Sequence, residues 1–567
     1  MVVLIGLWYA ALYAVVRPLA PGPVIDDWLY VHAVQEFART GRIAFGGFTQ
    51  AMPVSQVLYG ALWAKFFGAS YVSLHMAGAV LGMAGTIAFY ALARDAGLEP
   101  ARALTSSALL ACNPCYVLLS FSFMTDVAFV AVLLAACWAL GRSRRDAEVG
   151  GSAWLAAALL VVAFLVRFLA AVAIAGFVAA IATARSREAR AIQGPRRIAA
   201  RTLVPLGVAL MLSAAAWAWL TMMHPKPWAL RLDEQHFRWL LLVTPLSYFK
   251  DGILNPLLYL GAVLSPLGIP AAMRWGWKRA LGWSALLFVT ATVLIRAYPK
   301  LPVMPEFSCC GAWRNALQLP GLSGRFLWTG AWQWPALALS CLGASALIMA
   351  AERLHFPQRR GVTALLASAL FYLIALIPLW FFNDRYYLPL VPAGALMLAL
   401  AGPELRSVQK WAVLSLTAVM GLTSLGGLYA YQRGLSRLIA ERDALVRAGI
   451  PRANIDAGYP LNGADLYRWV NGGMDTMQSE KGIPMITAPE AASRYVLAAA
   501  PMTGAEVVRT LIIPGPFGLS SRKIYVLQRP SIRRRAGSPA QAPRATNPAG
   551  RTVRSRSGAI PVPNRSD

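Results

Sequence analysis

Long apolar runs separated by short polar segments recur along most of the chain, as at 202–223. A helix needs about 20 mostly apolar residues to cross the hydrocarbon core of a bilayer. Because backbone groups in lipid must be bonded within their own segment, each such run predicts a transmembrane helix. The pattern therefore predicts an all-α polytopic membrane protein.

Thirteen spans are expected. The first, at about 2–16, is read as an uncleaved helix because no basic signal-peptide region precedes it and Arg17 follows it. The others are expected at about 71–92, 103–121, 124–141, 153–166, 168–184, 202–223, 256–273, 281–298, 330–350, 362–382, 386–402 and 411–431. These spans make up a transmembrane domain over 1–431.

The first loop, 17–70, is long and polar, and it contains helical patterns at 28–39 and 56–67. The second pattern is too short to span and is expected to lie in the membrane interface. Short loops such as 142–145 and 185–201 are densely basic, which marks them as cytoplasmic by the positive-inside rule. With a cytoplasmic N-terminus and thirteen spans, the first loop and the C-terminal tail lie outside.

The tail divides into two parts. Residues 432–530 combine a helical stretch at 435–448 with strand-like runs at 494–499, 507–513 and 523–528, which predicts a small extracytoplasmic α/β appendage. From 531 to 567 Arg, Pro, Ser and Gly dominate, so this basic end is expected to be disordered.

The composition supports lipid as the solvent. Of 567 residues, 57% are hydrophobic and only 14% are charged, whereas about 25% is usual for a soluble domain. The net charge of +28 does not indicate nucleic-acid binding, because 20 of the 53 basic residues lie from residue 432 onward and the remaining 33 lie mostly in short loops between apolar runs. That placement is typical of membrane topology and of contact with anionic lipid.

Acidic residues stand at the outer ends of two spans. Asp26 and Asp27 follow the first span and open the helical pattern at 28–39, and Asp126 begins the span at 124–141. Each has an alternative reading as a helix N-cap, with Thr125 assisting Asp126. Since the predicted topology puts all three on one membrane face, they are candidates for shared chemistry.

Cations are expected on the same face. Arg167 interrupts an apolar stretch, and Arg385 is followed by Tyr386 and Tyr387. A guanidinium suits a phosphate or carboxylate partner. The alternatives are a snorkelling arginine and an aromatic-belt anchor. Lys65 is a weaker candidate of the same kind.

Neither a metal nor a nucleotide is predicted. The five histidines show no metal-ligand spacing, and a divalent metal near His224 and His236 is permitted by Asp233 and Glu234 but not indicated by them. The chain contains no G-x-x-x-x-G-K phosphate loop and no G-x-S-x-G elbow. No cofactor is therefore assigned.

The order of these motifs resembles the GT-C glycosyltransferases, in the family-39-like branch that contains protein O-mannosyltransferases and the aminoarabinose transferases of lipid A. The resemblance covers roughly residues 1–470. The matching segments are Asp26-Asp27-Trp28-Leu29-Tyr30, Leu58-Tyr59 through Phe67-Gly68, Met124-Thr125-Asp126, Leu165-Val166-Arg167, Arg385 through Pro389, and Asp456 through Tyr459 with Asn462-Gly463. One departure is Asp-Asp at 26–27, where the family often has Asp-Glu.

This resemblance implies an enzyme that transfers a hexosyl or pentosyl group from a polyprenyl-phosphate carrier to a lipid, glycan or protein acceptor. It implies activity at the outer face of the cytoplasmic membrane. Asp26 or Asp27 would be the base, with Asp26 favoured as the nearer to the cap position, and Asp126 would orient the acceptor or tune the base. The donor phosphate would bind Arg167, Arg385 and Lys65, and Tyr30, Tyr386 and Tyr387 would contact substrate.

Two other functions remain open at this level. A transporter or flippase of lipid-linked saccharides would also use intramembrane charges. Such proteins more often place charges at the bilayer midplane, whereas here the acids lie at the outer boundary next to a long loop. A glycan polymerase or ligase would share the donor and the compartment.

Overall fold

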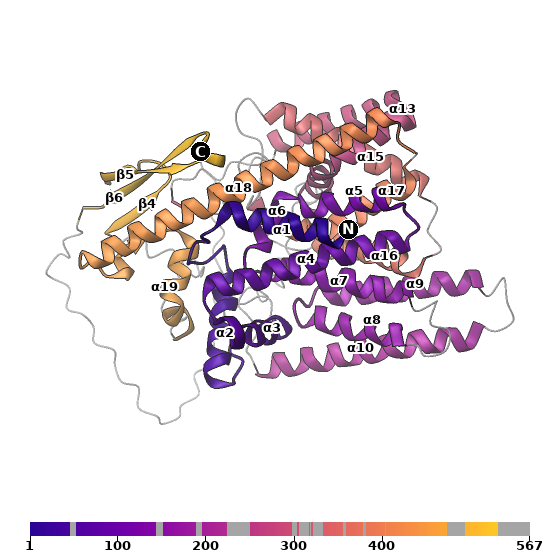
Figure 1. The fold of residues 1–567 in the computed structure, drawn as a ribbon, viewed down its shortest axis with the longest axis horizontal. Helices are drawn as coiled ribbons and strands as arrows, with labels where there is room; N and C mark the ends of the chain where they lie inside the picture. The colour runs from indigo at the N-terminus through magenta and orange to yellow at the C-terminus, as the bar shows by residue number, and fades with distance from the viewer. Residues whose placement is uncertain are drawn as a thin grey trace, which may run out of the picture. The chain divides into compact units, whose positions relative to one another are not determined.

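The computed structural model describes residues 1–45, 53–142, 151–188, 195–223, 250–297, 303–304, 317, 319–320, 333–354, 359–377, 382–402, 404–472 and 494–530. This part of the chain is mostly helical, with a small sheet near its C-terminal end (Figure 1). The predicted tail at 531–567 lies outside the described residues.

The predicted spans correspond closely to helices. They are α1 (Val2–Val16), α4 (Tyr71–Asp95), α5 (Pro100–Ala111), α6 (Pro114–Ser120), α7 (Thr125–Arg142), α8 (Gly151–Phe164), α9 (Ala170–Glu188), α10 (Pro195–Met223), α13 (Asn255–Ala297), α15 (Gln333–Arg353), α16 (Arg360–Leu376), α17 (Leu390–Ala401) and α18 (Ser407–Arg447). Within the described ranges, six helices are long and apolar enough to cross a membrane, or seven if the bent pair α5–α6 forms one span. Several others are shorter apolar helices, so the count of thirteen stays a prediction.

One predicted span is not a single straight helix. The span at 103–121 is broken into α5 and α6, which are bent by 68°. The break follows from Asn113-Pro114, because the residue before a proline avoids the helical region and the Asn113 side chain caps α6 by accepting from the backbone N–H of Cys115 and Tyr116.

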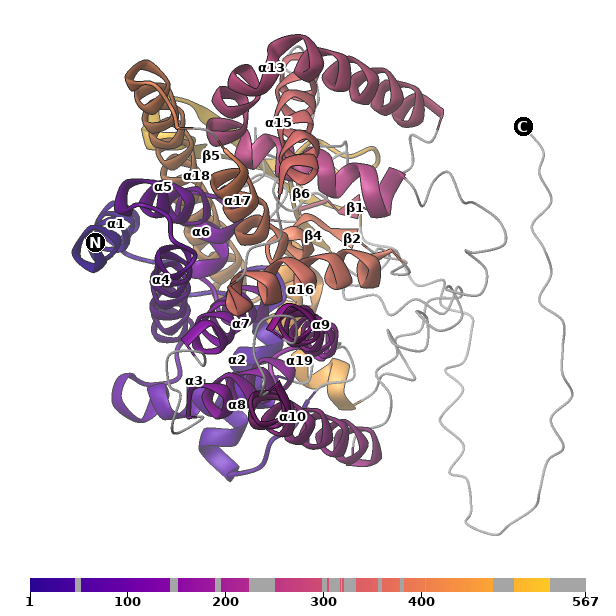
Figure 2. The same cartoon turned by 90° about the vertical axis from the view of Figure 1, so that its right-hand side faces the viewer.

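Residues 255–297 are continuous in hydrogen bonding but reverse direction at Gly276, whose φ of 139° is accessible to glycine. Leu258 from the first half shares a buried cluster with Leu294 from the second. Helical segments therefore cover the predicted span 256–273 and nearly all of 281–298, and α15 packs along them (Figure 2).

The first loop contains the two expected helices, α2 (Asp27–Thr40) and α3 (Val54–Phe67). The first turn of α3 is hydrogen-bonded to the turns next to α8 and α7. The Ser55 backbone N–H donates to the carbonyl of Leu165, and the Gln56 side chain donates to the carbonyl of Phe123. These contacts hold the first loop against the beginning of α7 and the end of α8.

Helix α4 packs very closely against the turn between α6 and α7. A Cβ atom added at Gly78 would lie 2.0 Å from the Ser122 carbonyl oxygen, and one at Gly82 would lie 2.3 Å from Ser120 Oγ. Glycine is therefore required for this approach, which brings the start of α7 alongside α4.

The C-terminal part contains α19 (Tyr459–Gly472), the short helix η4 (Arg452–Asn454) and a four-stranded sheet of order β3-β4-β6-β5, with β3 (Ile455–Asp456), β4 (Tyr495–Ala498), β5 (Glu506–Pro514) and β6 (Ser521–Gln528). Strands β3 and β4 are parallel, and the other pairs are antiparallel. The strands and the mixed α/β character match the predicted runs. The predicted helix at 435–448 is the continuation of α18, which passes through residue 431 unbroken.

Candidate functional site

A tight turn precedes α2 and positions its two aspartates. Ile25 in this turn is fully buried and has a φ of 56°, a conformation that a β-branched residue rarely adopts. Such conformations cost about 1–3 kcal/mol and persist where the surroundings fix them. Asp26 occupies the N-cap position and Asp27 begins the helix, but the Asp26 side chain makes no capping hydrogen bond. The carboxylate of Asp26 is therefore directed elsewhere.

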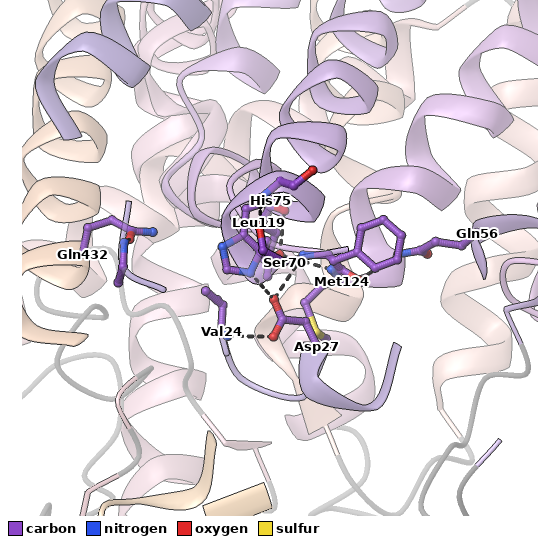
Figure 3. Close-up of polar contacts among 12 residues, drawn as sticks. Val24, Asp27, Gln56, Ser70, His75, Leu119, Met124 and Gln432 are labelled. Carbon is purple, nitrogen blue, oxygen red and sulfur yellow. Dashed lines mark hydrogen bonds and ion pairs between the residues drawn. The ribbon is translucent and has the colours of Figure 1, made fainter. Parts of the chain in front are cut away.

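Asp27 is fully buried and is held by three donors. Its Oδ1 accepts from the Val24 backbone N–H at 2.8 Å. Its Oδ2 lies 2.7 Å from His75 Nε2 and accepts from the Phe123 backbone N–H at 3.2 Å. Figure 3 shows these contacts converging on one carboxylate. Asp27 thus connects the turn before α2 with α4 and with the turn before α7.

His75 is a residue that the sequence reading missed. It lies on α4, and both its side chain and that of Asp27 are fully buried. The available signal was an isolated ionisable residue inside an apolar span, which is costly and therefore usually retained for a purpose. Metal-ligand spacing does not indicate His75, because its partner, Asp27, is a carboxylate in another element.

Asp26 forms an ion pair with Arg385, with 2.7 Å between Oδ2 and Nη2. The Asp26 side chain is 19% exposed, whereas that of Arg385 is 6% exposed. Arg385 belongs to the short helix η3 (Asp384–Tyr387), which follows strand β2 (Phe382–Asn383). Residues 359 positions apart therefore meet, and the carboxylate keeps access to solvent.

Asp126 forms a second pair, with Arg167. Arg167 Nη1 lies 2.9 Å from Asp126 Oδ1, and Arg167 Nε donates to Thr125 Oγ1 at 2.9 Å. Asp126 is almost fully buried. Burial lowers the pKa of Arg167, but Asp126, Tyr372 and Tyr386 together raise it by more, so the net direction is upward. Arg167 therefore stays charged in the turn between α8 and α9.

Tyr386 joins the two pairs. The guanidinium carbons of Arg167 and Arg385 lie 5.4 Å and 5.6 Å from the centre of its ring, within the range of cation–π attraction. Burial raises the pKa of Tyr386 despite the two cations. Burial, with Asp26 adding to it, also raises the pKa of Tyr30. Both phenols therefore remain neutral O–H groups.

Two predicted site residues do not join this cluster. Tyr387 is buried and packs against Tyr259 with 5.5 Å between ring centres. Lys65 is exposed near the end of α3, and no ion pair links it to either acid in the described part of the chain. Asp26, Asp126, Arg167 and Arg385 come together around Tyr386, whereas the Tyr387 ring packs on Tyr259 and Lys65 is exposed.

A metal centre finds no support among the described residues, which contain no group of three or more His, Cys, Asp or Glu that could hold an ion. His224 and His236, with their acidic neighbours, lie outside the described residues.

The C-terminal part contacts the start of α2. Trp28, next to the aspartates, lies edge-on to Tyr459 with 6.4 Å between ring centres. A Cβ at Gly463 would lie 2.3 Å from the Trp28 ring, so glycine is needed there. Asp456 accepts from Asn462 at 2.8 Å, which holds the turn that leads into α19.

Comparison with known proteins agrees with the motifs. Residues 53–224 match the family model described as dolichyl-phosphate-mannose-protein mannosyltransferase. No curated protein matches. Solved structures with low similarity include ArnT from Cupriavidus metallidurans in the apo state, at 15% identity and a TM-score of 0.39, covering 92% of this chain and 97% of that one.

A second ArnT structure from the same organism, bound to undecaprenyl phosphate, has 12% identity and a TM-score of 0.41, with coverage of 93% and 98%. The archaeal oligosaccharyltransferase AglB from Archaeoglobus fulgidus, in complex with an inhibitory peptide and a dolichol-phosphate, has 14% identity, a TM-score of 0.39 and coverage of 78% and 57%. The family match includes Asp126 and Arg167. Residues 53–224 are therefore similar to the dolichyl-phosphate-mannose-protein mannosyltransferase family, in agreement with the resemblance that the motifs indicate.

Proposed function

We propose that this protein is a membrane glycosyltransferase that moves a sugar from a polyprenyl-phosphate carrier to an acceptor hydroxyl. The observation that carries the proposal is the convergence of the pairs Asp26–Arg385 and Asp126–Arg167 on Tyr386. A transfer of this kind needs a base beside a phosphate-binding cluster of cations. The family match over 53–224 supports the same chemistry.

Asp26 is the proposed general base. Its carboxylate is partly exposed and is not used as a cap, whereas that of Asp27 is fully buried and bonded. The acceptor O–H would give its proton to Asp26 as the oxygen attacks the anomeric carbon of the donor sugar. The bond between that carbon and the phosphate oxygen breaks at the same time, and the carrier phosphate leaves with the electron pair.

Arg385 and Arg167 are the proposed phosphate ligands. Charge develops on the leaving phosphate during transfer, and fixed guanidinium groups stabilise it without reorganisation. Tyr30 and Tyr386 would add O–H donors, because burial keeps both phenols neutral. When the donor phosphate binds, Arg385 would shift from Asp26 toward it, which would release the base for the acceptor.

Asp126 and Asp27 are proposed to position these groups. Asp126 holds the Arg167 guanidinium at 2.9 Å. Asp27, held by His75, fixes the turn from which Asp26 projects. By the positive-inside pattern, the site would face outward from the cytoplasmic membrane, with the tail on the same side. A hexosyl or pentosyl donor is expected.

The test is a turnover assay with the full-length protein in lipid nanodiscs and a labelled polyprenyl-phosphate sugar. We expect release of carrier phosphate and transfer or hydrolysis of the sugar, both lost in Asp26→Asn. Asp443→Asn, an exposed carboxylate on α18, is the matched control and should leave turnover unchanged. Lipid-linked saccharide that crosses liposomes without bond cleavage would instead establish a transporter, and transfer of whole glycans a polymerase or ligase.

A further inference from the structure

The hairpin formed by β5 and β6 exposes large apolar side chains. Ile512 on β5 is 60% exposed, and Leu519 in the turn between the strands is 87% exposed. Phe517, in the same turn, is 44% exposed. Water-exposed hairpins seldom carry such residues at their tip, so this turn has the composition of a surface that meets lipid or another apolar partner.

The position of this turn relative to the membrane follows from its contact with α18. Phe517 stacks on Tyr429 with 6.3 Å between ring centres, and a Cβ at Gly426 would lie 2.8 Å from the Phe517 ring. Both positions belong to the predicted apolar span 411–431. Gly426 is five residues before the end of that span, or about 7.5 Å along a helix. The hairpin tip therefore lies at the level of the bilayer surface.

Aromatic and cationic residues on α18 mark the same level. Tyr429, which is partly exposed, is of the type that forms aromatic belts at membrane surfaces. The Arg433 guanidinium lies 5.3 Å from the centre of the Tyr429 ring, as expected of a cation that reaches toward head groups. The boundary inferred from the hairpin contact agrees with the boundary inferred from α18.

A cavity of about 340 Å³ lies between α18 and this sheet. Its wall combines apolar side chains with two cations, and no carboxylate is among the described residues that line it. The relevant lining residues are Leu319, Ala430, Ile513, Ile524, Arg522 and Lys523. This volume can hold a lipid head group and the first carbons of an acyl chain, but not a whole lipid.

We propose that this cavity binds the phosphate head group of an anionic phospholipid while the hairpin tip 515–519 contacts the acyl region of the same leaflet. Arg522 lies on the same face of the sheet as Ile513 and Ile524, so it supplies the charge complement beside their apolar wall. Lys523, at the next position of the strand, adds to the local positive charge. The site shares no residue with the two acid–arginine pairs. It would hold the sheet against the membrane surface beside α18.

The first experiment measures lipid retention. Full-length protein is placed in phosphatidylcholine nanodiscs with a minor fraction of radiolabelled phosphatidylglycerol, extracted mildly and assayed for bound label. We expect the double variant R522Q/K523Q to lose about tenfold or more of the label, because each cation near an anionic surface contributes appreciably to binding. R437Q/R447Q removes the same charge from exposed positions on α18 and should retain it.

Two results of this measurement would overturn the site: equal retention in both double variants, or equal retention of labelled phosphatidylcholine. Competition by polyprenyl phosphate but not by phosphatidylglycerol would show that the cavity takes the sugar carrier, and would also overturn it. None of these readouts depends on turnover, so they are separate from the test of the proposed function.

The second experiment tests depth. A benzophenone side chain introduced at Leu519 should photocrosslink to lipid in nanodiscs. The same group at Arg447, which is sixteen residues beyond Tyr431 and thus about 24 Å further along α18, should not. Absence of lipid adducts at position 519, with the protein intact, would exclude membrane contact by the hairpin.

Discussion

The N-termini of α2 and α7 each hold an aspartate paired with a distant arginine, but the two pairs differ in burial. The Asp26 side chain is 19% exposed and has one ion-pair contact with Arg385, whereas that of Asp126 is 1% exposed beside Arg167. An acid that must take up a proton during turnover needs access to substrate and solvent. An acid that must keep a cation in place benefits from being enclosed. The difference therefore suggests a division of work between two chemically identical groups.

The most damaging change should be Asp26→Asn. It removes the proposed base while preserving shape, and general base catalysis contributes about 10²- to 10⁴-fold to turnover. We expect kcat to fall by that amount with unchanged membrane insertion and unchanged donor KM. Asp26→Glu should recover part of the rate. Wild-type kcat in Asp26→Asn would remove the distinction between the two pairs.

The next largest effect is expected at the buried pair. Arg167→Leu leaves Asp126 enclosed without its cation, which should cost about 3–5 kcal/mol of stability. The double variant Asp126→Leu/Arg167→Leu should regain most of this stability but not the activity. Thermal unfolding of the purified protein measures the stability of both variants, and carrier-phosphate release measures their activity.

The matched control for this pair is Arg279→Leu. Arg279 pairs with Glu352 at 2.9 Å, but its side chain is 55% exposed, so the loss should be within about 1 kcal/mol. If the buried and exposed changes cost the same, Asp126–Arg167 does not have the fixed role assigned to it.

Arg385→Lys should have a smaller effect. Lysine keeps the charge but not the planar fork that binds phosphate through two N–H groups. We expect the donor KM to rise about tenfold with a smaller change in kcat. Arg437→Lys, at an exposed position, is the control. An effect on kcat alone would assign Arg385 to the base rather than to the donor.

The smallest effect is expected from His75→Gln. Glutamine can still donate to Asp27 Oδ2, so turnover should stay near wild type. His75→Leu removes one of the three donors to Asp27 and should lower kcat about two- to tenfold without changing KM. Steady-state kinetics of both variants separate a positioning role from a merely structural one, because loss of fold would lower the active fraction of both.

Much of the fold could be predicted from the sequence because hydropathy reports burial in lipid directly. The start of α1 and the ends of α4 and α7 fall within a few residues of their predicted positions. The span expected at 103–121 passes through Asn113-Pro114 because the apolar run continues there, although Asn-Pro is a recognisable helix-start signal and marks the break between α5 and α6. The extension of α18 beyond the span was missed because polar residues after 431 were read as a separate element.

The site could be predicted only in part. Charge in an otherwise apolar chain singled out Asp26, Asp126, Arg167 and Arg385, and these residues do meet. Which acid pairs with which arginine depends on packing across as many as 359 positions, and a single sequence carries no record of such distances. Asp26 is partly exposed and pairs with Arg385, whereas the adjacent Asp27 is fully buried. This difference depends on the conformation of the turn before α2, which hydrophobic periodicity does not predict.

Because Gly78 has no side chain, α4 can approach the turn before α7 closely, and this approach determines the distance between the helix starts that hold Asp26 and Asp126. Because His75 lies less than one helical turn away on α4, the same stretch of helix bonds Asp27 and presses on Ser122. Even a single methyl group at residue 78 would clash with the Ser122 carbonyl oxygen. The clash would move the start of α7 away from α4 and Asp126 away from Asp26. The spacing between the two acids thus depends on the absence of a side chain at residue 78.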